Sequence, residues 1–149
     1  MPTRALALAL LCALVGHGAE PLSPLGRWKT YDDKTGALHG LVEITEERGE
    51  LKGRIIKSYD PKKPNPTCDL CEGDLKGKPV LGMVFLWGLS RQGEEYRGGF
   101  ILDPDNGKVY KAKLHLEEGG RKLLVRGFIG FSLIGRTQTW IRDDPGAPA

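Results

Sequence analysis

The hydrophobic and polar residues of this chain form eight short runs of β type, separated by turn-forming residues, and in several runs the two kinds alternate. In the clearest run, Tyr110, Ala112, Leu114 and Leu116 fall on one face, and Lys111, Lys113 and His115 fall on the other. A period of two is typical of a β-strand with one face buried and the other in water. The runs cover residues 26–31, 38–45, 51–58, 80–89, 95–102, 108–116, 122–129 and 133–142. With no convincing amphipathic helix, the pattern predicts an all-β protein.

Short connections separate most of these runs, and short connections join antiparallel neighbours. Closing such a meander into a barrel removes its two open edges, so we expect an eight-stranded antiparallel up-and-down barrel. Its interior should hold packed side chains or one small ligand. A β-sandwich is the alternative, but it needs longer crossing connections, and only residues 59–79 form a long one. Residues 80–89 are almost uniformly apolar, which predicts burial on both sides or at the barrel seam.

The first residues follow the pattern of a secretory signal peptide. Arg4 provides a positive charge, residues 5–15 are apolar throughout, and small residues follow at positions 16, 18 and 19. The apolar run is too short to span a bilayer, and we expect cleavage after Gly18 or Ala19. The alternatives are an uncleaved anchor or lipid attachment at Cys12, although the residue before Cys12 is not small.

This division predicts a signal peptide at residues 1–18, a single β-barrel domain at 19–143 and a loose tail at 144–149. Export to the periplasm or the cell exterior follows, with no transmembrane segment in the mature chain. The full chain has 22 Lys and Arg against 19 Asp and Glu; processing removes Arg4 and leaves 21 against 19, a net charge of +2. A nearly balanced chain without a basic run is a poor nucleic-acid binder.

Cys68 and Cys71 are the two cysteines left after processing. An even number of cysteines in an exported chain favours a disulfide. A reactive pair is an alternative, but Asp69 and Glu72 would raise the pKa of a nearby thiol. A metal site is the third possibility, with only the distant His39 and His115 as further ligands. A structural disulfide that shapes the long loop is the favoured interpretation.

Motifs for catalysis or cofactor binding are missing from the sequence: there is no serine-nucleophile elbow, no His-Glu-x-x-His and no phosphate loop. Residues 103–107 contain alternating oxygen donors, but a tight hairpin turn explains them better than a calcium loop does. We therefore expect a protein that is not an enzyme and carries no cofactor or metal.

Five residues are candidates for a ligand site inside the barrel. Tyr110, Leu114 and Trp140 are expected to form its wall. Arg126 and Arg136 are expected to make polar contacts, because a guanidinium orients carboxylates and similar groups well. The alternative is that both arginines point outward and pair with surface acids, and strand register decides between the two.

Two features resemble lipocalin-type barrels. Gly26-Arg27-Trp28 opens the first predicted strand, and Arg142 ends the last. In lipocalin-like barrels, a first-strand tryptophan packs across the closed end against an arginine of the last strand. The resemblance therefore assigns structural roles to Trp28 and Arg142.

A second resemblance extends over nearly the whole mature chain. Its motifs include Asn65-Pro66-Thr67-Cys68, Gly98-Gly99-Phe100-Ile101-Leu102-Asp103-Pro104, Arg126-Gly127-Phe128-Ile129-Gly130 and Gly135-Arg136-Thr137-Gln138-Thr139-Trp140. These resemble the exported bacterial proteins grouped as domain of unknown function 2147. The resemblance implies a lipocalin-like barrel and secretion into the cell envelope. It brings no established activity and no catalytic residues.

Three functions fit these expectations. The first is a non-enzymatic carrier or sensor that holds a small, partly apolar ligand inside the barrel, in a cavity of a few hundred Å³. The second is an interaction module whose loop at residues 59–79 docks on another envelope protein, which needs an exposed apolar patch. The third, least favoured, is a thiol-disulfide protein, which needs an accessible cysteine with a lowered pKa.

Overall fold

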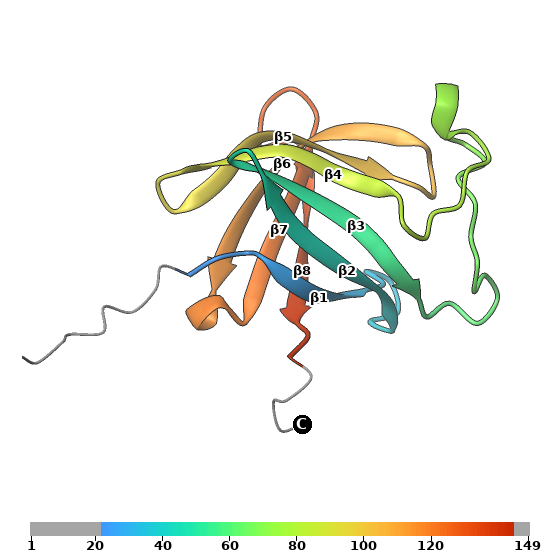
Figure 1. Ribbon diagram of the computed structural model, residues 1–149, viewed down its shortest axis with the longest axis horizontal. Helices are drawn as coiled ribbons and strands as arrows, with labels where there is room; N and C mark the ends of the chain where they lie inside the picture. Colours follow the sequence, from blue (N-terminus) through green and yellow to red (C-terminus); the bar gives the residue numbers. More distant parts are fainter. Residues whose placement is uncertain (1–21, 145–149) are drawn as a thin grey trace, which may run out of the picture.

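The computed structural model describes residues 22–144, and these fold into one closed antiparallel barrel. Each strand pairs with its neighbours in the sequence, and β8 returns to pair with β1, so the predicted meander is confirmed (Figure 1). The strands are β1 (Gly26–Tyr31), β2 (Leu38–Glu47), β3 (Glu50–Ser58), β4 (Val84–Gln92), β5 (Glu95–Asp103), β6 (Lys108–Glu117), β7 (Lys122–Phe128) and β8 (Gly135–Arg142). The expected signal peptide and residues 145–149 of the expected tail lie outside the described residues.

The fourth strand differs most from its prediction, because it begins at Val84 rather than at residue 80 and extends to Gln92. Val80 and Met83 are buried without being in a strand, and their apolar side chains join the core from the end of the long loop. Hydrophobicity alone does not separate a buried loop end from a buried strand. Strand β8 likewise begins two residues later than predicted, at Gly135.

The pairing of β3 with β4 has two irregularities, and these bear on the run of apolar residues at the start of β4. The register shifts between Gly53 and Arg54 and again between Leu51 and Lys52. A bulge inserts an extra residue and lets two consecutive side chains turn toward the same side of the sheet. Phe85 and Leu86 are accordingly both buried in the core.

The barrel has two different ends, because the connections of a meander alternate between them. At one end, the turns after β2, β4 and β6 meet the chain just before β1. Trp28 lies at this end, fully buried, with its indole Nε1 donating to the Pro24 carbonyl at 2.8 Å. The Arg142 guanidinium carbon lies 4.2 Å from the centre of a Trp28 ring. We refer to this end as the closed end.

The Arg142 side chain also connects β8 to two other chain segments at the closed end. Its guanidinium donates to the carbonyls of Gly120 at 2.7 Å, Leu25 at 2.8 Å and Ser23 at 2.7 Å. These carbonyls belong to the turn after β6 and to the segment before β1. Trp28 and Arg142 are also partners in the β1–β8 pairing, which is the seam that closes the barrel. The Arg142 side chain therefore stabilises this seam and also the chain segments that cover the closed end, which we call the floor of the barrel.

Large side chains fill the interior above this floor. The rings of Phe85 and Trp140, from opposite parts of the sheet, lie 5.9 Å apart. The fully buried set around them includes Trp28, Ile44, Leu51, Leu86, Leu89, Leu114, Leu123 and Trp140. Aromatic and branched aliphatic side chains of this size pack the interior of an eight-stranded barrel as a core.

Replacing Arg142 with Ala should destabilise the barrel by about 3 kcal/mol, because three carbonyls lose a charged donor and the Trp28 ring loses its cation. Equilibrium urea unfolding followed by tryptophan fluorescence measures the change. The matched control is Arg121→Ala, whose side chain is exposed and makes only a surface ion pair with Glu118; it should cost less than about 0.5 kcal/mol. Equal effects of the two substitutions would contradict the assignment.

Candidate functional site at the open end

The opposite end of the barrel carries the longer and more varied connections. They follow β1, β3, β5 and β7, and the connection after β3 spans residues 59–83. We call this the open end. Its connections carry several large apolar side chains that are exposed to solvent: Leu70, Leu75, Ile129, Phe131, Leu133 and Ile134.

The long connection after β3 is closed on itself by a disulfide between Cys68 and Cys71, as predicted. The Cys68 amide donates to the Lys78 carbonyl at 2.9 Å, and the Gly77 amide donates to the Cys68 carbonyl at 2.8 Å. Both cysteines are buried. An exchange-active thiol needs solvent access, so this burial favours a structural role.

The disulfide loop, residues 68–78, packs against the tip of the β5–β6 hairpin. Gly107 sits at this contact with φ +72°, and a Cβ there would lie 1.9 Å from the Leu70 carbonyl oxygen and 2.7 Å from the Cys71 nitrogen. Leu102, on the outer face of β5, is buried together with both cysteines. Only glycine permits this approach, because it supplies the left-handed conformation without a side chain.

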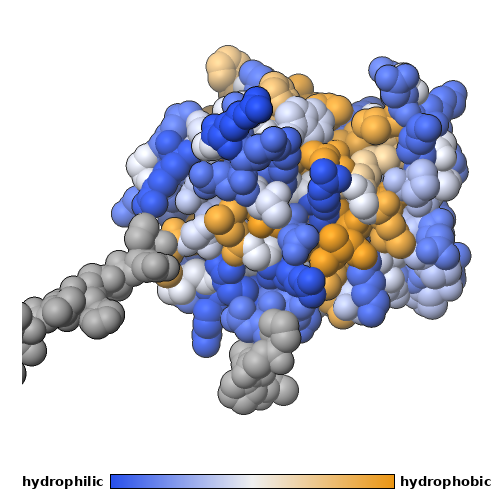
Figure 2. Space-filling model, viewed as in Figure 1, coloured by the Kyte–Doolittle hydropathy of each residue, from blue (hydrophilic) through white to orange (hydrophobic). Residues whose placement is uncertain are grey.

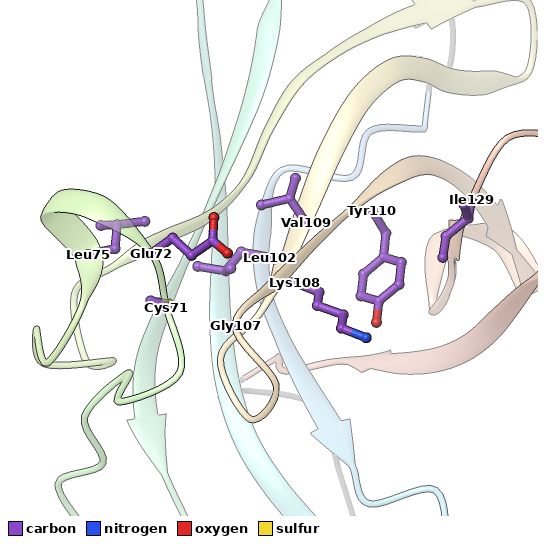
Figure 3. A pocket seen from close by; sticks show the side chains of 9 residues that line it. All are labelled: Cys71, Glu72, Leu75, Leu102, Gly107, Lys108, Val109, Tyr110 and Ile129. Carbon is purple, nitrogen blue, oxygen red and sulfur yellow. The ribbon is translucent and has the colours of Figure 1, made fainter.

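A groove of about 370 Å³ crosses the hairpin beside this contact. Figure 3 shows that the disulfide loop forms one side of the groove and that Tyr110 and Ile129 lie toward the other. The lining residues are Cys71, Glu72, Leu75, Leu102, Gly107, Lys108, Val109, Tyr110 and Ile129. We call this the mouth groove.

The groove combines apolar surface with a few polar groups. Leu75, Val109 and Ile129 are large apolar residues that remain exposed there. Lys108 and Tyr110 point to the same side of the hairpin in Figure 3, and Asn106 donates from Nδ2 to the Tyr110 hydroxyl at 3.0 Å. The Glu72 carboxylate lies near the opposite wall. Small-molecule sites commonly have this composition.

The five residues predicted to form a ligand site are not brought together. Tyr110 lines the mouth groove. Leu114 and Trp140 are buried in the packed core beneath it. Arg136 forms an ion pair with Asp33 at 3.1 Å on the turn after β1. Packed side chains fill the interior of the barrel around Leu114 and Trp140. The groove that solvent can reach lies at the open end instead.

Arg126 was expected to make polar contacts inside the barrel, with an outward orientation as the alternative, and it lies on the outer face. Its neighbour Val125 is buried, and alternation along β7 turns Arg126 the other way. The guanidinium donates to the Ser132 carbonyl at 2.6 Å and to the Thr137 hydroxyl at 2.9 Å. Arg126 therefore organises the connection after β7.

A pocket of about 150 Å³ lies on this outer face, with Glu95, Lys113 and His115 among its lining residues. A hydrogen bond from Arg97, with smaller contributions from Lys113 and His115, holds the pKa of Glu95 below its usual range. The Nδ1 atom of His115 is buried there without a hydrogen-bond partner. Within residues 22–144, no three His, Cys, Asp or Glu side chains are grouped so that they could hold a metal ion.

Sequence reasoning missed the groove residues Glu72, Leu75, Lys108, Val109 and Ile129. One signal was available, since Val109 is an apolar residue on the polar side of β6 and Ile129 is an apolar residue in a connection. Their meeting with Leu75 depends on how the disulfide loop folds over the hairpin. That contact joins segments more than 30 residues apart in the chain.

Asp33 and Asp32 organise another part of the open end. Asp33 accepts from Arg136 and, at 3.2 Å, from Gln138 Nε2, which ties the turn after β1 to β8. Asp32 accepts from the Thr35 amide at 2.7 Å, the Thr35 hydroxyl at 2.9 Å and the Lys34 amide at 3.0 Å. These bonds, chiefly those from Thr35, hold the pKa of Asp32 below its usual range.

The closed antiparallel meander, its filled floor and its open end define this chain as a lipocalin-like barrel. It belongs to the family named domain of unknown function 2147, described as uncharacterized proteins conserved in bacteria, and matches it over residues 26–142. The chain is similar in structure to protein HP1028 from the human pathogen Helicobacter pylori, which is described as belonging to the lipocalin family. The TM-score is 0.73 at 23% identity, over 83% of this chain and 85% of that one.

A search of curated proteins found no match to the chain. Among the helices of residues 22–144, none is long and apolar enough to cross a membrane.

Gly107→Ala should displace the disulfide loop from the hairpin, because the new methyl group would occupy the position of the Leu70 carbonyl. Amide exchange at residues 68–78 should increase, as measured by hydrogen-deuterium exchange. Gly93→Ala is the matched control, since its φ of +68° is nearly the same but nothing lies within 4 Å of the added carbon. That control should cost only the conformational strain of about 1 kcal/mol, and equal exchange in both variants would disprove the contact.

Asp32→Ala should destabilise the protein at neutral pH and much less in acid. A carboxyl with a lowered folded-state pKa stabilises above its unfolded pKa, and the contribution disappears as the pH falls through the folded value. Urea unfolding of both proteins at about pH 7 and about pH 3 measures the two differences. A difference that grows in acid would contradict this assignment.

Proposed function

We propose that this protein is an exported, non-enzymatic binder of a small, partly apolar molecule, and that the ligand sits in the mouth groove. The observation that carries the proposal is a groove of about 370 Å³ at the open end of a lipocalin-like barrel. Ligand sites in proteins are typically of about 300–1,000 Å³ and mostly apolar, with a few polar groups. Because Trp140 and Leu114 are buried in the core, the ligand lies above the core rather than deep inside the barrel.

The lining suggests which chemistry the ligand has. Leu75, Val109 and Ile129 offer contact to an apolar body of a few carbon atoms. Lys108 and the Tyr110 hydroxyl offer hydrogen bonds to an acceptor or anionic group at one side. We infer an amphipathic ligand with a short apolar body and one acidic or strongly accepting group.

The composition of the groove supports binding rather than catalysis by a hydroxyl or thiol nucleophile. The nine residues that line the groove include no serine, threonine or histidine, and their single cysteine is in the disulfide. Nucleophilic catalysis needs a nucleophile beside a base within hydrogen-bond reach. The signal-like N-terminus and the disulfide support an exported protein of the periplasm or cell exterior.

A second function is supported by one observation. Leu70 and Leu75 are exposed on the disulfide loop, as a docking site for another envelope protein at residues 59–79 would require. In that case Leu70→Ser would weaken partner binding. The ligand proposal expects no effect of that substitution, because Leu70 is not among the groove residues.

Val109→Asp should weaken binding of 1-anilinonaphthalene-8-sulfonate, an apolar anion used as the probe, by about tenfold. The introduced carboxylate removes apolar contact and repels the sulfonate. Fluorescence titration of the purified protein gives the dissociation constants. Leu22→Asp introduces the same carboxylate at an exposed leucine of the closed end; it is the control and should leave binding unchanged.

Native mass spectrometry of protein purified without denaturation from its own host tests the natural ligand. A reproducible added mass that is lost in Val109→Asp would support the proposal and identify the ligand class. Probe binding that is equal in wild type, Val109→Asp and Leu22→Asp would reject the mouth groove as the site.

A further inference from the structure

The connection after β7 carries four large apolar side chains that are exposed to solvent. Ile129 is 63% exposed, Phe131 78%, Leu133 90% and Ile134 64%. We call residues 129–134 the apolar tip. In Figure 2, hydrophobic residues protrude at the upper edge of the molecule, where Figure 1 places the connection between β7 and β8. Side chains exposed in this way mark protein or membrane contacts.

Hydrogen bonds hold the apolar tip in one shape. The Ile129 amide donates to the Ile134 carbonyl at 3.0 Å, and the Ile134 amide donates to the Phe131 carbonyl at 3.0 Å. The Arg126 guanidinium fixes the Ser132 carbonyl at 2.6 Å. The backbone is therefore ordered before any partner arrives, and burial of the side chains costs little additional backbone entropy.

Positive charge surrounds the base of the apolar tip. The parts of β6, β7 and β8 that lie toward the open end carry four cations: Lys108, Lys111, Arg126 and Arg136. Lys111 is exposed and lies beside Phe128 in the β6–β7 pairing, at the end of β7 that leads into the tip. Two acids on this side of the barrel are engaged in ion pairs, Asp33 with Arg136 and Glu95 with Arg97 and Lys113, while Glu72 lies across the mouth groove from Ile129. This charge complements an anionic surface.

We propose that the apolar tip inserts into the interface of a bilayer that contains anionic phospholipid, with Lys111 and its cationic neighbours at the headgroups. The tip is the protruding end of a hairpin, and a planar apolar layer can receive its four side chains without a shaped cavity. The apolar residues at the tip with cations behind them match the two layers of a bilayer surface, hydrocarbon and anionic headgroup.

Insertion of the apolar tip would also determine where the mouth groove lies relative to the membrane. Ile129 belongs both to the apolar tip and to the lining of the groove, so membrane contact brings the groove close to the lipid surface, where apolar molecules concentrate. The membrane contact itself does not depend on what the groove binds. The two proposals therefore fail separately.

Vesicle flotation of the purified protein tests the contact. We expect the protein to float with vesicles of phosphatidylcholine that contain about a third phosphatidylglycerol, and less with phosphatidylcholine alone. Phe131→Ser/Leu133→Ser should reduce the bound fraction by about tenfold, because it removes the two most exposed apolar side chains. Leu22→Ser, at an exposed leucine of the closed end, should bind as the wild type does.

The charge contribution has its own matched pair. Lys111→Glu should weaken binding to the anionic vesicles severalfold, whereas Arg121→Glu changes the net charge equally at the closed end and should have little effect. Both side chains are exposed, so circular dichroism and thermal unfolding should show intact folding. A Phe131→Trp variant reports insertion, since brominated lipids should quench its added fluorescence.

Several results would overturn the proposal. One is absence of flotation with either vesicle type, and another is equal flotation of wild type and Phe131→Ser/Leu133→Ser. A third is a dimer in sedimentation velocity that Leu133→Ser abolishes, without vesicle binding, which would show that the tip contacts a second copy of the chain. Probe binding in the mouth groove is measured without lipid, so its loss or survival is independent of these outcomes.

Discussion

The contact between Arg142 and Trp28 determines how the rest of the barrel can be arranged. An eight-stranded meander is stable as a barrel only when its first and last strands pair, and here that pairing joins Trp28 with Arg142. The guanidinium covers the indole ring and binds three carbonyls from the segment before β1 and the turn after β6. The seam and the floor therefore depend on one side chain. With one end fixed in this way, the opposite end is free to carry long connections.

The closed end of the barrel contributes mainly to stability, and the open end carries the proposed binding surfaces. Trp28, Phe85 and Trp140 fill the interior of the barrel, and the groove lies at the open end. The disulfide loop rests on Gly107 and forms a wall of that groove. A small disulfide ring adds little to global stability, since the loop that it closes is short. Its effect is local, because it keeps Glu72 and Leu75 beside the β5–β6 hairpin.

The proposed ligand site and the proposed membrane contact occupy neighbouring parts of the open end. Both use apolar side chains that the barrel does not need for its own stability, and Ile129 takes part in each. Arg126, expected from the sequence to contact a ligand, instead fixes the shape of the apolar tip through Ser132. A charged side chain on an outer face thus organises a surface that is mainly apolar. The arrangement would bring an amphipathic ligand, the groove and a lipid surface into one region.

The sequence by itself determined the fold class. The period of two around Tyr110, Ala112 and Leu114 defines a half-buried strand, short turns make its neighbours antiparallel, and the resemblance to a lipocalin-like family agrees with both. The sequence did not determine the site. Leu114 lies on the same face of β6 as the groove residue Tyr110, but it is further from the open end of the barrel. Leu114 and Trp140 are therefore buried in the core. Register turned Arg126 outward, bulges turned Phe85 and Leu86 to one side, and the folding of the disulfide loop over Gly107 created the groove. Alternation is a local property of the backbone, whereas depth, register and loop packing arise from contacts between distant segments, and only the tertiary structure decides those.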